Sequence, residues 1–275
     1  MASPPDVTLN NGVPMPQLGF GVFQIPDNGT EAAVAHALTA GYRSIDTAAA
    51  YRNERAVGAA VAKSPLSREE IFITTKLWNG DQGHDNALRA FDASMERLGI
   101  EHLDLYLIHW PVPAKDLYSE TWRAFESLYA EGRIRAIGVS NFQVEHLQRL
   151  FDEHEIVPAV NQIELHPYLP QTELRQFHEE HGIATEAWSP IAQGAVLTDP
   201  KIEAVAERLG KTPAQVVLRW HMQIGSIAIP KSVSPARIVE NIDIFDFELS
   251  EEDLAAIDGL DRVHRTGPHP DTFGT

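Results

Sequence analysis

Short apolar runs alternate with helical patterns along the whole chain. Eight such runs occur: LGFGVF (18–23), RSIDT (43–47), IFITTKL (71–77), LDLYLIH (103–109), RAIGVS (135–140), AVNQIE (159–164), ATEAWS (184–189) and SIAIPK (226–231). Runs of this length are typical of buried strands, and the segments between them, such as TEAAVAHALTAG (30–41), have apolar residues at helical spacing. Strands separated by helices are expected to be parallel, because antiparallel neighbours need no helical crossover.

Helix ends are marked by glycines and by capping residues. Glycines follow the predicted helices at positions 41, 99, 132, 182, 210 and 225. TPAQ (212–215) and SEED (250–253) each place a hydroxyl at a helix start and a polar side chain three residues later, which is a capping-box pattern. These boundaries support the alternation of strands and helices.

Eight strand–helix units are the number that closes a (β/α)8 barrel. We therefore expect an α/β fold, a TIM barrel formed by residues 1–275 as a single domain. Asn11-Gly12, between two extended stretches, predicts an N-terminal β-hairpin that caps the bottom of the barrel. The alternative is a doubly wound open sheet, but GFGVFQ (19–24) lacks the third glycine of a phosphate-binding turn and opens no helix.

Ionisable residues stand at or just after the ends of three successive runs. Asp46, Lys76 and His109 are each the last or nearly the last residue of a run, and Tyr51 follows the first of these runs within one short loop. Active sites of such barrels lie at the C-terminal ends of the strands, so these four side chains are expected to meet at one mouth. One Asp or His in such a place is more often structural, but four complementary groups favour chemistry.

The types of these residues suit proton donation to a carbonyl oxygen. A free phenol has a pKa of about 10 and is a poor acid near neutrality. We expect Lys76, kept charged by Asp46, to lower the pKa of Tyr51 into a working range, because an ammonium at about 4 Å is worth roughly 4 kcal/mol. His109 would orient the carbonyl by hydrogen bonding. Reduction also requires a source of hydride.

The later runs are followed by residues suited to a dinucleotide. The segment after the eighth run, KSVSPAR (231–237), places Lys231, Ser232 and Arg237 at the start of a helix, where barrels often bind phosphate. Ser140, Asn141 and Gln162 end the fifth and sixth runs and could hold the carboxamide of a nicotinamide, on which Trp188 could stack. The alternative for KSVSPAR is a solvated helix start with incidental cations.

Composition restricts the possible partners and the compartment. The chain has a formal net charge of −17 and no cysteine. Nucleic acid and anionic membranes are therefore unexpected partners, and disulfides and thiolate sites are excluded. The N-terminus lacks a signal-peptide pattern, and no apolar run approaches the length of a membrane span. We expect a cytoplasmic monomer that binds a small molecule and needs no metal.

These residues together resemble the aldo-keto reductases over nearly the whole chain. GYRSIDTA (41–48), SNF (140–142) and IPKS (229–232) look like the three signatures of that family, and the subgroup of bacterial 2,5-diketo-D-gluconate reductases is the most similar. The resemblance implies a (β/α)8 barrel that binds NADPH across its mouth. It also implies that Tyr51 is the general acid, tuned by Lys76 and Asp46, and that His109 orients the carbonyl.

The resemblance further assigns contacts to the cofactor and the substrate. The implied cofactor-binding residues are Gly21, Ser140, Asn141, Gln162, Trp188, Ser189, Ile191, Gln193, Lys231, Ser232, Val233, Arg237, Glu240 and Asn241. The implied substrate-binding residues are Phe23, Trp78, His109 and Trp110. Arg52 stands where glycine is common in the subgroup and could narrow the entrance or contact an anionic substrate. The short C-terminal tail predicts a fairly open pocket.

The sequence leaves several alternatives open. The chain could be a non-catalytic barrel that binds NADPH as a sensor or partner subunit, or a phosphate-binding barrel isomerase. A diketo sugar acid, a methylglyoxal-type dicarbonyl and an aromatic aldehyde are all possible substrates. HEEH (178–181) has the spacing of a metal pair, but we interpret it as a surface helix because no third ligand is evident.

Overall fold

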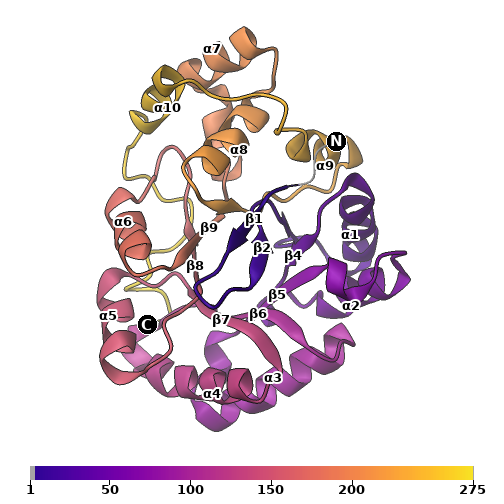
Figure 1. The fold of residues 1–275 in the computed structure, drawn as a ribbon, viewed down its shortest axis with the longest axis vertical. Helices are drawn as coiled ribbons and strands as arrows, with labels where there is room; N and C mark the ends of the chain where they lie inside the picture. Colours follow the sequence, from indigo (N-terminus) through magenta and orange to yellow (C-terminus); the bar gives the residue numbers. More distant parts are fainter. Residues whose placement is uncertain (1–3, 275) are drawn as a thin grey trace.

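Eight parallel strands form the centre of the molecule (Figure 1). The computed structural model describes residues 4–274, so residues 1–3 and 275 of the predicted domain lie outside the described residues. The strands are β3 (Phe20–Gly21), β4 (Ser44–Asp46), β5 (Phe72–Leu77), β6 (Leu103–Ile108), β7 (Ile134–Ser140), β8 (Val160–Glu164), β9 (Ala184–Trp188) and β10 (Ile227–Ala228). Each lies within one of the predicted runs or differs from it by one residue.

The sheet closes on itself. Consecutive strands are neighbours from β3 to β10, and a parallel bridge between Leu18 and Ala228 joins the two edges. The amide of Gly21 adds a hydrogen bond of 3.1 Å to the carbonyl of Pro230 across the same seam. The predicted (β/α)8 barrel is thereby confirmed, and the open doubly wound sheet is excluded.

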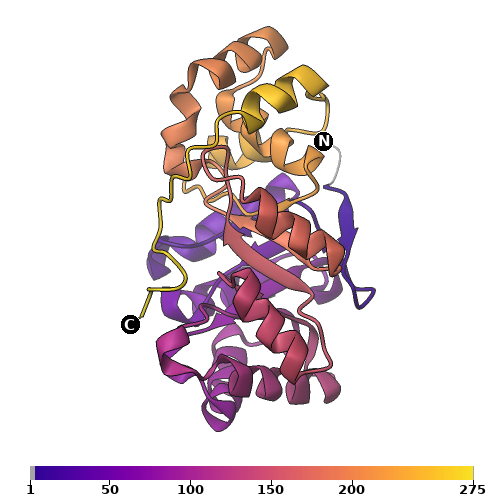
Figure 2. The same cartoon turned by 90° about the vertical axis from the view of Figure 1, so that its left-hand side faces the viewer.

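Helices surround this barrel in both views (Figures 1 and 2). They are α1 (Asp27–Ala40), α2 (Glu54–Lys63), α3 (His84–Leu98), α4 (Tyr118–Ala130), α5 (Val144–Glu153), α6 (Thr172–Glu180), α7 (Pro200–Leu209), α8 (Pro213–Gln223), α9 (Pro235–Ile242) and α10 (Glu251–Asp258). Short 3-10 segments lie in the connections between strands and helices: η1 (Ala49–Tyr51), η2 (Arg68–Glu70), η3 (Asn79–Asp81), η4 (Pro113–Lys115) and η5 (Ala192–Thr198).

Most of the predicted helix boundaries are confirmed. The six glycines predicted at helix ends all have a positive φ, a backbone conformation that residues other than glycine rarely adopt. Thr212 and Ser250 form the two predicted capping boxes with Gln215 and Asp253. Ser234 is the N-cap residue of α9, but its side chain makes no capping hydrogen bond.

The predicted hairpin closes one end of the barrel. Its strands are β1 (Asp6–Thr8) and β2 (Pro14–Pro16), and Gly12 at φ 84° completes the turn between them. Leu9 and Met15 pack on apolar side chains inside the barrel, which include Phe72 and Leu105. The hairpin and the C-terminal tail lie on opposite sides of the barrel in Figure 2. These apolar contacts close the barrel interior at the hairpin end.

No helix within residues 4–274 is long and apolar enough to cross a membrane.

Candidate active site

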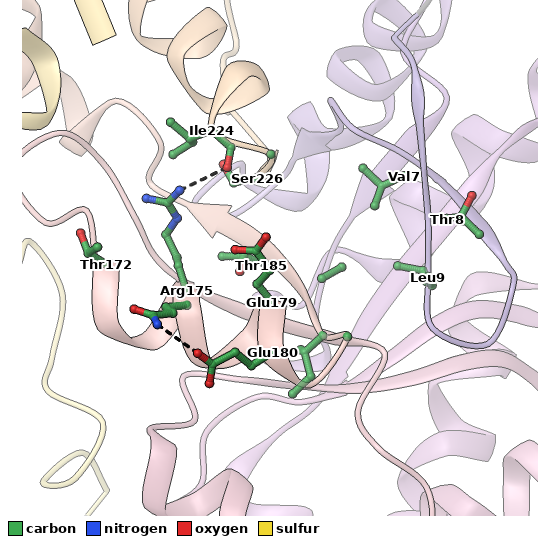
Figure 3. A pocket seen from close by; sticks show the side chains of 15 residues that line it. Val7, Thr8, Leu9, Thr172, Arg175, Glu179, Glu180, Thr185, Ile224 and Ser226 are labelled. Carbon is green, nitrogen blue, oxygen red and sulfur yellow. Dashed lines mark hydrogen bonds between the residues drawn. The ribbon is translucent and has the colours of Figure 1, made fainter. Parts of the chain in front are cut away.

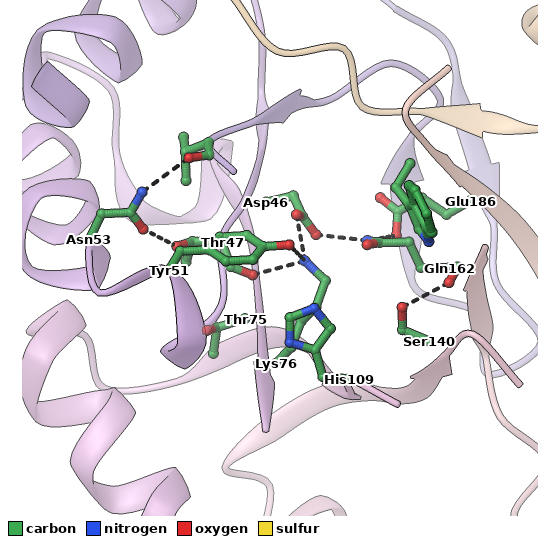
Figure 4. A network of polar contacts seen from close by, with 12 residues as sticks. Asp46, Thr47, Tyr51, Asn53, Thr75, Lys76, His109, Ser140, Gln162 and Glu186 are labelled. Carbon is green, nitrogen blue, oxygen red and sulfur yellow. Dashed lines mark hydrogen bonds and ion pairs between the residues drawn. The ribbon is translucent and has the colours of Figure 1, made fainter. Parts of the chain in front are cut away.

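Lys76 lies at the centre of a buried polar cluster (Figure 4). Its Nζ donates to Asp46 Oδ1 at 2.6 Å and to the carbonyl of Thr47 at 3.0 Å, and it lies 3.4 Å from Tyr51 Oη. Asp46 comes from the end of β4 and Lys76 from the adjacent β5, so parallel pairing places both at one mouth. The structure thus brings three of the four residues predicted for catalysis into direct contact.

Hydrogen bonds to neighbouring segments hold the loop that carries Tyr51 in place. Thr47 donates its hydroxyl to Asn53 Oδ1 at 2.8 Å, and Asn53 Nδ2 donates to the carbonyls of Val22 and Ile25. The loop residues between Asp46 and Tyr51 are Thr and Ala, whose small side chains let η1 lie close over β5. These contacts hold the phenol above the ammonium.

His109 completes the predicted set. Its ring centroid lies 5.6 Å from that of Tyr51 and 5.4 Å from that of Trp78. Burial, with a smaller effect of Lys76, holds the pKa of His109 well below its ordinary value. The imidazole is therefore neutral at physiological pH, and it can hydrogen-bond a carbonyl oxygen without adding a charge.

The expected lowering of the Tyr51 pKa is wrong for this structure. Burial raises the pKa of Tyr51, and although Lys76 lowers it, the net result lies above the ordinary value. Burial alone would lower the pKa of Lys76, but Asp46 and Tyr51 outweigh it and the net direction is upward. Asp46 keeps the ammonium charged as expected, but its own charge opposes the effect of Lys76 on the Tyr51 pKa.

An amide layer lies beside the cluster. Asn141 Nδ2 donates to the carbonyl of His109 at 3.0 Å and to Ser140 Oγ at 3.1 Å, and its Oδ1 accepts from Trp188 Nε1 at 2.8 Å. Gln162 Nε2 donates to Asp46 Oδ2 at 2.8 Å. The structure therefore links the residues predicted to hold a nicotinamide carboxamide directly to the predicted catalytic residues.

A cavity of about 1450 Å³ opens above these groups. Asp46, Tyr51 and His109 line its inner end, whereas Lys76 lies beneath the surface. The predicted substrate residues line it as well, and from there it extends past η5 to the segment that follows β10. A cavity of this size exceeds the usual range of about 300–1,000 Å³ for one small ligand, so it suits a cofactor together with a substrate.

The far end of this cavity carries two cations. Lys231 and Arg237 are exposed, and neither forms an ion pair with any residue from 4 to 274. Ser232 is buried and accepts from the amide of Ser234 at 3.1 Å. The structure therefore leaves both charges available to a ligand.

Most of the other predicted cofactor contacts line the same cavity. Those that do are Gly21, Ser140, Asn141, Gln162, Trp188, Ser189, Ile191 and Gln193. Ser232, Val233, Glu240 and Asn241 are not among its lining residues. Asn241 is buried, and Glu240 accepts from the hydroxyl of Thr212 at 2.9 Å, so both are engaged within the protein.

The chain matches a known family over most of its length. Residues 17–262 match the model of the aldo/keto reductase family. The chain belongs to the aldo/keto reductase family. It is 55% identical over 267 residues to a glyoxal reductase of Bacillus subtilis, covering 96% of each chain. It is 50% identical to the methylglyoxal reductase DkgA of Escherichia coli, over the full length of both.

Solved relatives extend the comparison to the fold. The apo structure of Gox0644 has a TM-score of 0.95 and 49% identity and covers 98% of this chain and 99% of its own. A mutant of Gox0644 in complex with NADPH also has a TM-score of 0.95, at 48% identity and with the same coverage. The chain is thus an NADP-dependent oxidoreductase that acts on carbonyl groups, which confirms the predicted family, enzyme class and cofactor.

The aldo/keto reductase site contains aromatic walls that sequence reasoning found only in part. Phe23 lies 4.9 Å from Tyr51 between ring centroids, and Trp78 and Trp110 stand beside His109. Phe273 was missed: its ring centroid lies 4.4 Å from that of Trp110. The C-terminal tail therefore forms one wall of the pocket, whereas the expected openness of the pocket stays a prediction.

The tail is attached to the barrel through a second missed residue, Glu164. This buried carboxylate accepts hydrogen bonds from the backbone and hydroxyl of Thr266, from Gly267 at 3.3 Å and from His166 at 3.0 Å. Burial would raise the pKa of Glu164, but the bonds from His166 and Thr266 hold it below the ordinary value. Glu164 ends the sixth apolar run, so its position at a strand end was a usable signal.

The surface-helix interpretation of HEEH is wrong for one of its two histidines. His178 is buried and contacts Asn161 Nδ2 and Thr185 Oγ1, each at 2.9 Å. Burial lowers its pKa to about 3. His181 is exposed and stacks on Phe177 with ring centroids 4.2 Å apart. The two histidines therefore have different surroundings, because one faces the barrel and the other faces solvent at the end of α6.

A separate hollow of about 760 Å³ lies at the hairpin end of the barrel (Figure 3). Arg175 donates to the carbonyl of Ile224 at 3.2 Å, and Gln176 donates to Glu180 at 3.0 Å. These polar groups are satisfied within the protein, and the residues that line the hollow form no buried ion pair with one another. The mouth that holds Lys76 therefore remains the candidate active site.

Proposed function

We propose that this protein reduces small aldehydes and ketones, including dicarbonyls, to alcohols with NADPH, and that Tyr51 is the proton donor. The observation that carries the proposal is the buried Asp46–Lys76–Tyr51 chain of contacts at 2.6 and 3.4 Å, with neutral His109 beside it. Bound NADPH supplies the hydride. All of residues 1–275 would serve this one site as a single domain.

The residues that line the cavity fit this cofactor. The side-chain oxygen Oε1 of Gln162 makes no hydrogen bond to residues 4–274, although Gln162 lines the cavity, so this atom can accept from a carboxamide. Lys231 and Arg237 have no carboxylate partner within the same residues and suit the 2′-phosphate. Trp188 would stack on the nicotinamide. The remaining proposed contacts to the cofactor come from Gly21, Ser140, Asn141, Ser189, Ile191, Gln193, Ser232, Val233, Glu240 and Asn241.

The protein's own groups would act in a defined order. His109 donates a hydrogen bond to the carbonyl oxygen and orients it toward Tyr51 Oη. As negative charge develops on that oxygen, Tyr51 transfers its proton, and the phenolate that forms lies against the Lys76 ammonium. Asp46 keeps Lys76 charged throughout. The raised pKa of Tyr51 keeps the phenol protonated between turnovers, which suits reduction.

The pocket walls favour small carbonyls with a flat or polar end. Phe23, Trp78, Trp110 and Phe273 line the cavity together with His109 and give this part of it flat aromatic walls. Arg52 lines the same cavity, which favours a substrate with an anionic or dicarbonyl end. The related glyoxal and methylglyoxal reductases carry names for substrates of this kind. A diketo sugar acid and an aromatic aldehyde are the competing classes.

A panel assay tests the proposal. NADPH consumption is followed with methylglyoxal, glyoxal, a diketo sugar acid and an aromatic aldehyde. We expect turnover of several of them, with kcat/KM highest for a dicarbonyl. NADPH binding without turnover of any of them would instead favour a non-catalytic binding protein.

The two cavity cations should set the preference for the phosphorylated cofactor. We expect the double variant Lys231→Met/Arg237→Met to raise the KM for NADPH by about 100-fold or more, since each charge-assisted contact contributes about 1.5–3 kcal/mol and both are lost. The KM for NADH should change by less than about threefold, because NADH lacks the phosphate that these cations would meet. Lys201→Met, on the exposed face of α7, serves as the control. Equal losses for both cofactors would contradict the assignment of these cations.

A further inference from the structure

Glu186 is a buried carboxyl group to which the proposed mechanism gives no role. It lies in the middle of β9, in register with Gln162 of β8, and two residues before Trp188 on the same inward face. Its side chain is fully buried. Figure 4 shows it on the far side of Gln162 from Asp46. A carboxyl group in such a place requires an explanation, because burial of an acid is costly.

One nitrogen atom joins Glu186 to the catalytic cluster. Gln162 Nε2 donates to Asp46 Oδ2 and to Glu186 Oε2, each at 2.8 Å. The side-chain amide nitrogen has two hydrogens, so both are used, and the side-chain oxygen Oε1 of Gln162 must point elsewhere. That oxygen is the atom free to meet a ligand in the cavity. The two carboxyl groups therefore orient the Gln162 side chain so that its amide oxygen, and not its nitrogen, is available to a ligand in the cavity.

The charges around Glu186 are unbalanced. Lys76 is the cation of the cluster and is already paired with Asp46 at 2.6 Å. The other ionisable groups of the cluster, Tyr51 on η1 and His109 after β6, are neutral, and Gln162 on β8 carries no charge. Glu186 Oε1 has no hydrogen-bond partner among the described residues. Burial, reinforced by Asp46, raises the pKa of Glu186 to about 8, so the group is mostly protonated at neutral pH.

We propose that Glu186 is a positioning residue: it holds the amide of Gln162 in the orientation that serves the cofactor, and its change of charge is transmitted through the buried cluster to Tyr51. The inference rests on the proposed roles of Tyr51 and Gln162. A charge on Glu186 raises the pKa of Tyr51. Loss of the Glu186 proton therefore makes Tyr51 a weaker acid and its phenolate harder to form.

The effect of Glu186 on Tyr51 should be largest for the oxidation of an alcohol, which is the reverse of carbonyl reduction. When an alcohol is oxidised, its hydroxyl proton goes to the Tyr51 phenolate and its carbon-bound hydrogen leaves with two electrons to NADP+. The phenolate must form before this step. In the wild type, the negative charge of ionised Glu186 means that the Tyr51 phenolate forms only at higher pH. The isosteric variant Glu186→Gln cannot ionise, so its phenolate should form at lower pH.

The experiment compares pH profiles of kcat for alcohol oxidation in wild type, Glu186→Gln and Glu186→Leu. We expect Glu186→Gln to keep most of kcat at its optimum and to shift the alkaline rise downward by at least about 0.5 pH unit. Glu186→Leu removes the acceptor for Gln162, and we expect kcat to fall about 10-fold and the KM for NADP+ to rise. Glu126→Gln, on helix α4 away from the cluster, should leave the profile unchanged.

The outcomes separate the inference from the proposed function. A Glu186→Gln profile that superimposes on the wild type overturns the role of Glu186, provided that Tyr51→Phe is inactive. An active Tyr51→Phe variant overturns the proposed function instead. If the variants do not fold, infrared difference spectra between neutral and alkaline pH test the inference on wild type with isotope-labelled glutamate. The band of a protonated glutamate should disappear as the pH is raised. A spectrum without such a band at neutral pH overturns the inference.

Discussion

Replacing Tyr51 with phenylalanine is expected to reduce kcat for carbonyl reduction by about 10²–10⁴-fold, the usual contribution of a general acid. The substitution removes only the hydroxyl that lies 3.4 Å from Lys76 Nζ. The ring can still pack on Phe23 and His109, whose centroids lie 4.9 and 5.6 Å away. NADPH affinity should therefore change by less than about twofold, as measured by quenching of protein fluorescence, because the packing of the site is kept.

Tyr118→Phe is the matched control for this variant. Tyr118 is a buried tyrosine in α4 that contacts Phe142 and lies outside the cavity. Its loss of a hydroxyl should leave kcat within about twofold of wild type, because no reacting group touches it. Retention of more than about a tenth of the activity by Tyr51→Phe would show that another group donates the proton.

Replacing Lys76 with methionine is expected to affect both activity and stability. The ammonium is fully buried and paired with Asp46, so its removal leaves an uncompensated buried carboxylate. Breaking such a pair typically costs about 3–5 kcal/mol, and we expect the free energy of unfolding to fall by that amount. The kcat should fall by about 10²–10⁴-fold, because the phenolate of Tyr51 loses its stabilising charge.

A double variant separates the two effects. Replacing both partners, as Lys76→Met/Asp46→Leu, removes the unpaired charge, and stability should largely recover, whereas activity should not. Lys63→Met is the control, because Lys63 pairs with Glu31 at the exposed surface, where an ion pair is worth about 0–1 kcal/mol. Denaturant unfolding and steady-state kinetics measure the two quantities. Recovery of activity in the double variant would contradict the role of the ammonium.

The pH dependence of this stabilisation has a defined sign. The pKa of Lys76 is raised in the folded state, so the stability that its pairing contributes is fully present below the unfolded value of about 10.5. That contribution is lost only as the pH rises through the still higher folded value. The difference in the free energy of unfolding between wild type and Lys76→Met should therefore not decline as the pH rises across the neutral range.

The sequence by itself determined the barrel and the chemistry of its mouth. The eight apolar runs are local patterns, and each became a strand because its side chains are buried against helices on one face and the barrel interior on the other. Asp46, Lys76 and His109 stand at or just beyond the ends of consecutive parallel strands. Such ends meet at one mouth whatever the details of packing, so their association could be predicted without coordinates.

The tertiary structure alone decided features that depend on distance and burial. The pKa of Tyr51 is raised because burial and Asp46 outweigh Lys76, and no sequence pattern reports that balance. Phe273, near the end of the chain, reaches Trp110 after β6, and Glu186 meets Asp46 only through Gln162. Local periodicity predicts which face of an element is buried, but contacts between distant segments and the depth of a charge depend on how the whole chain packs.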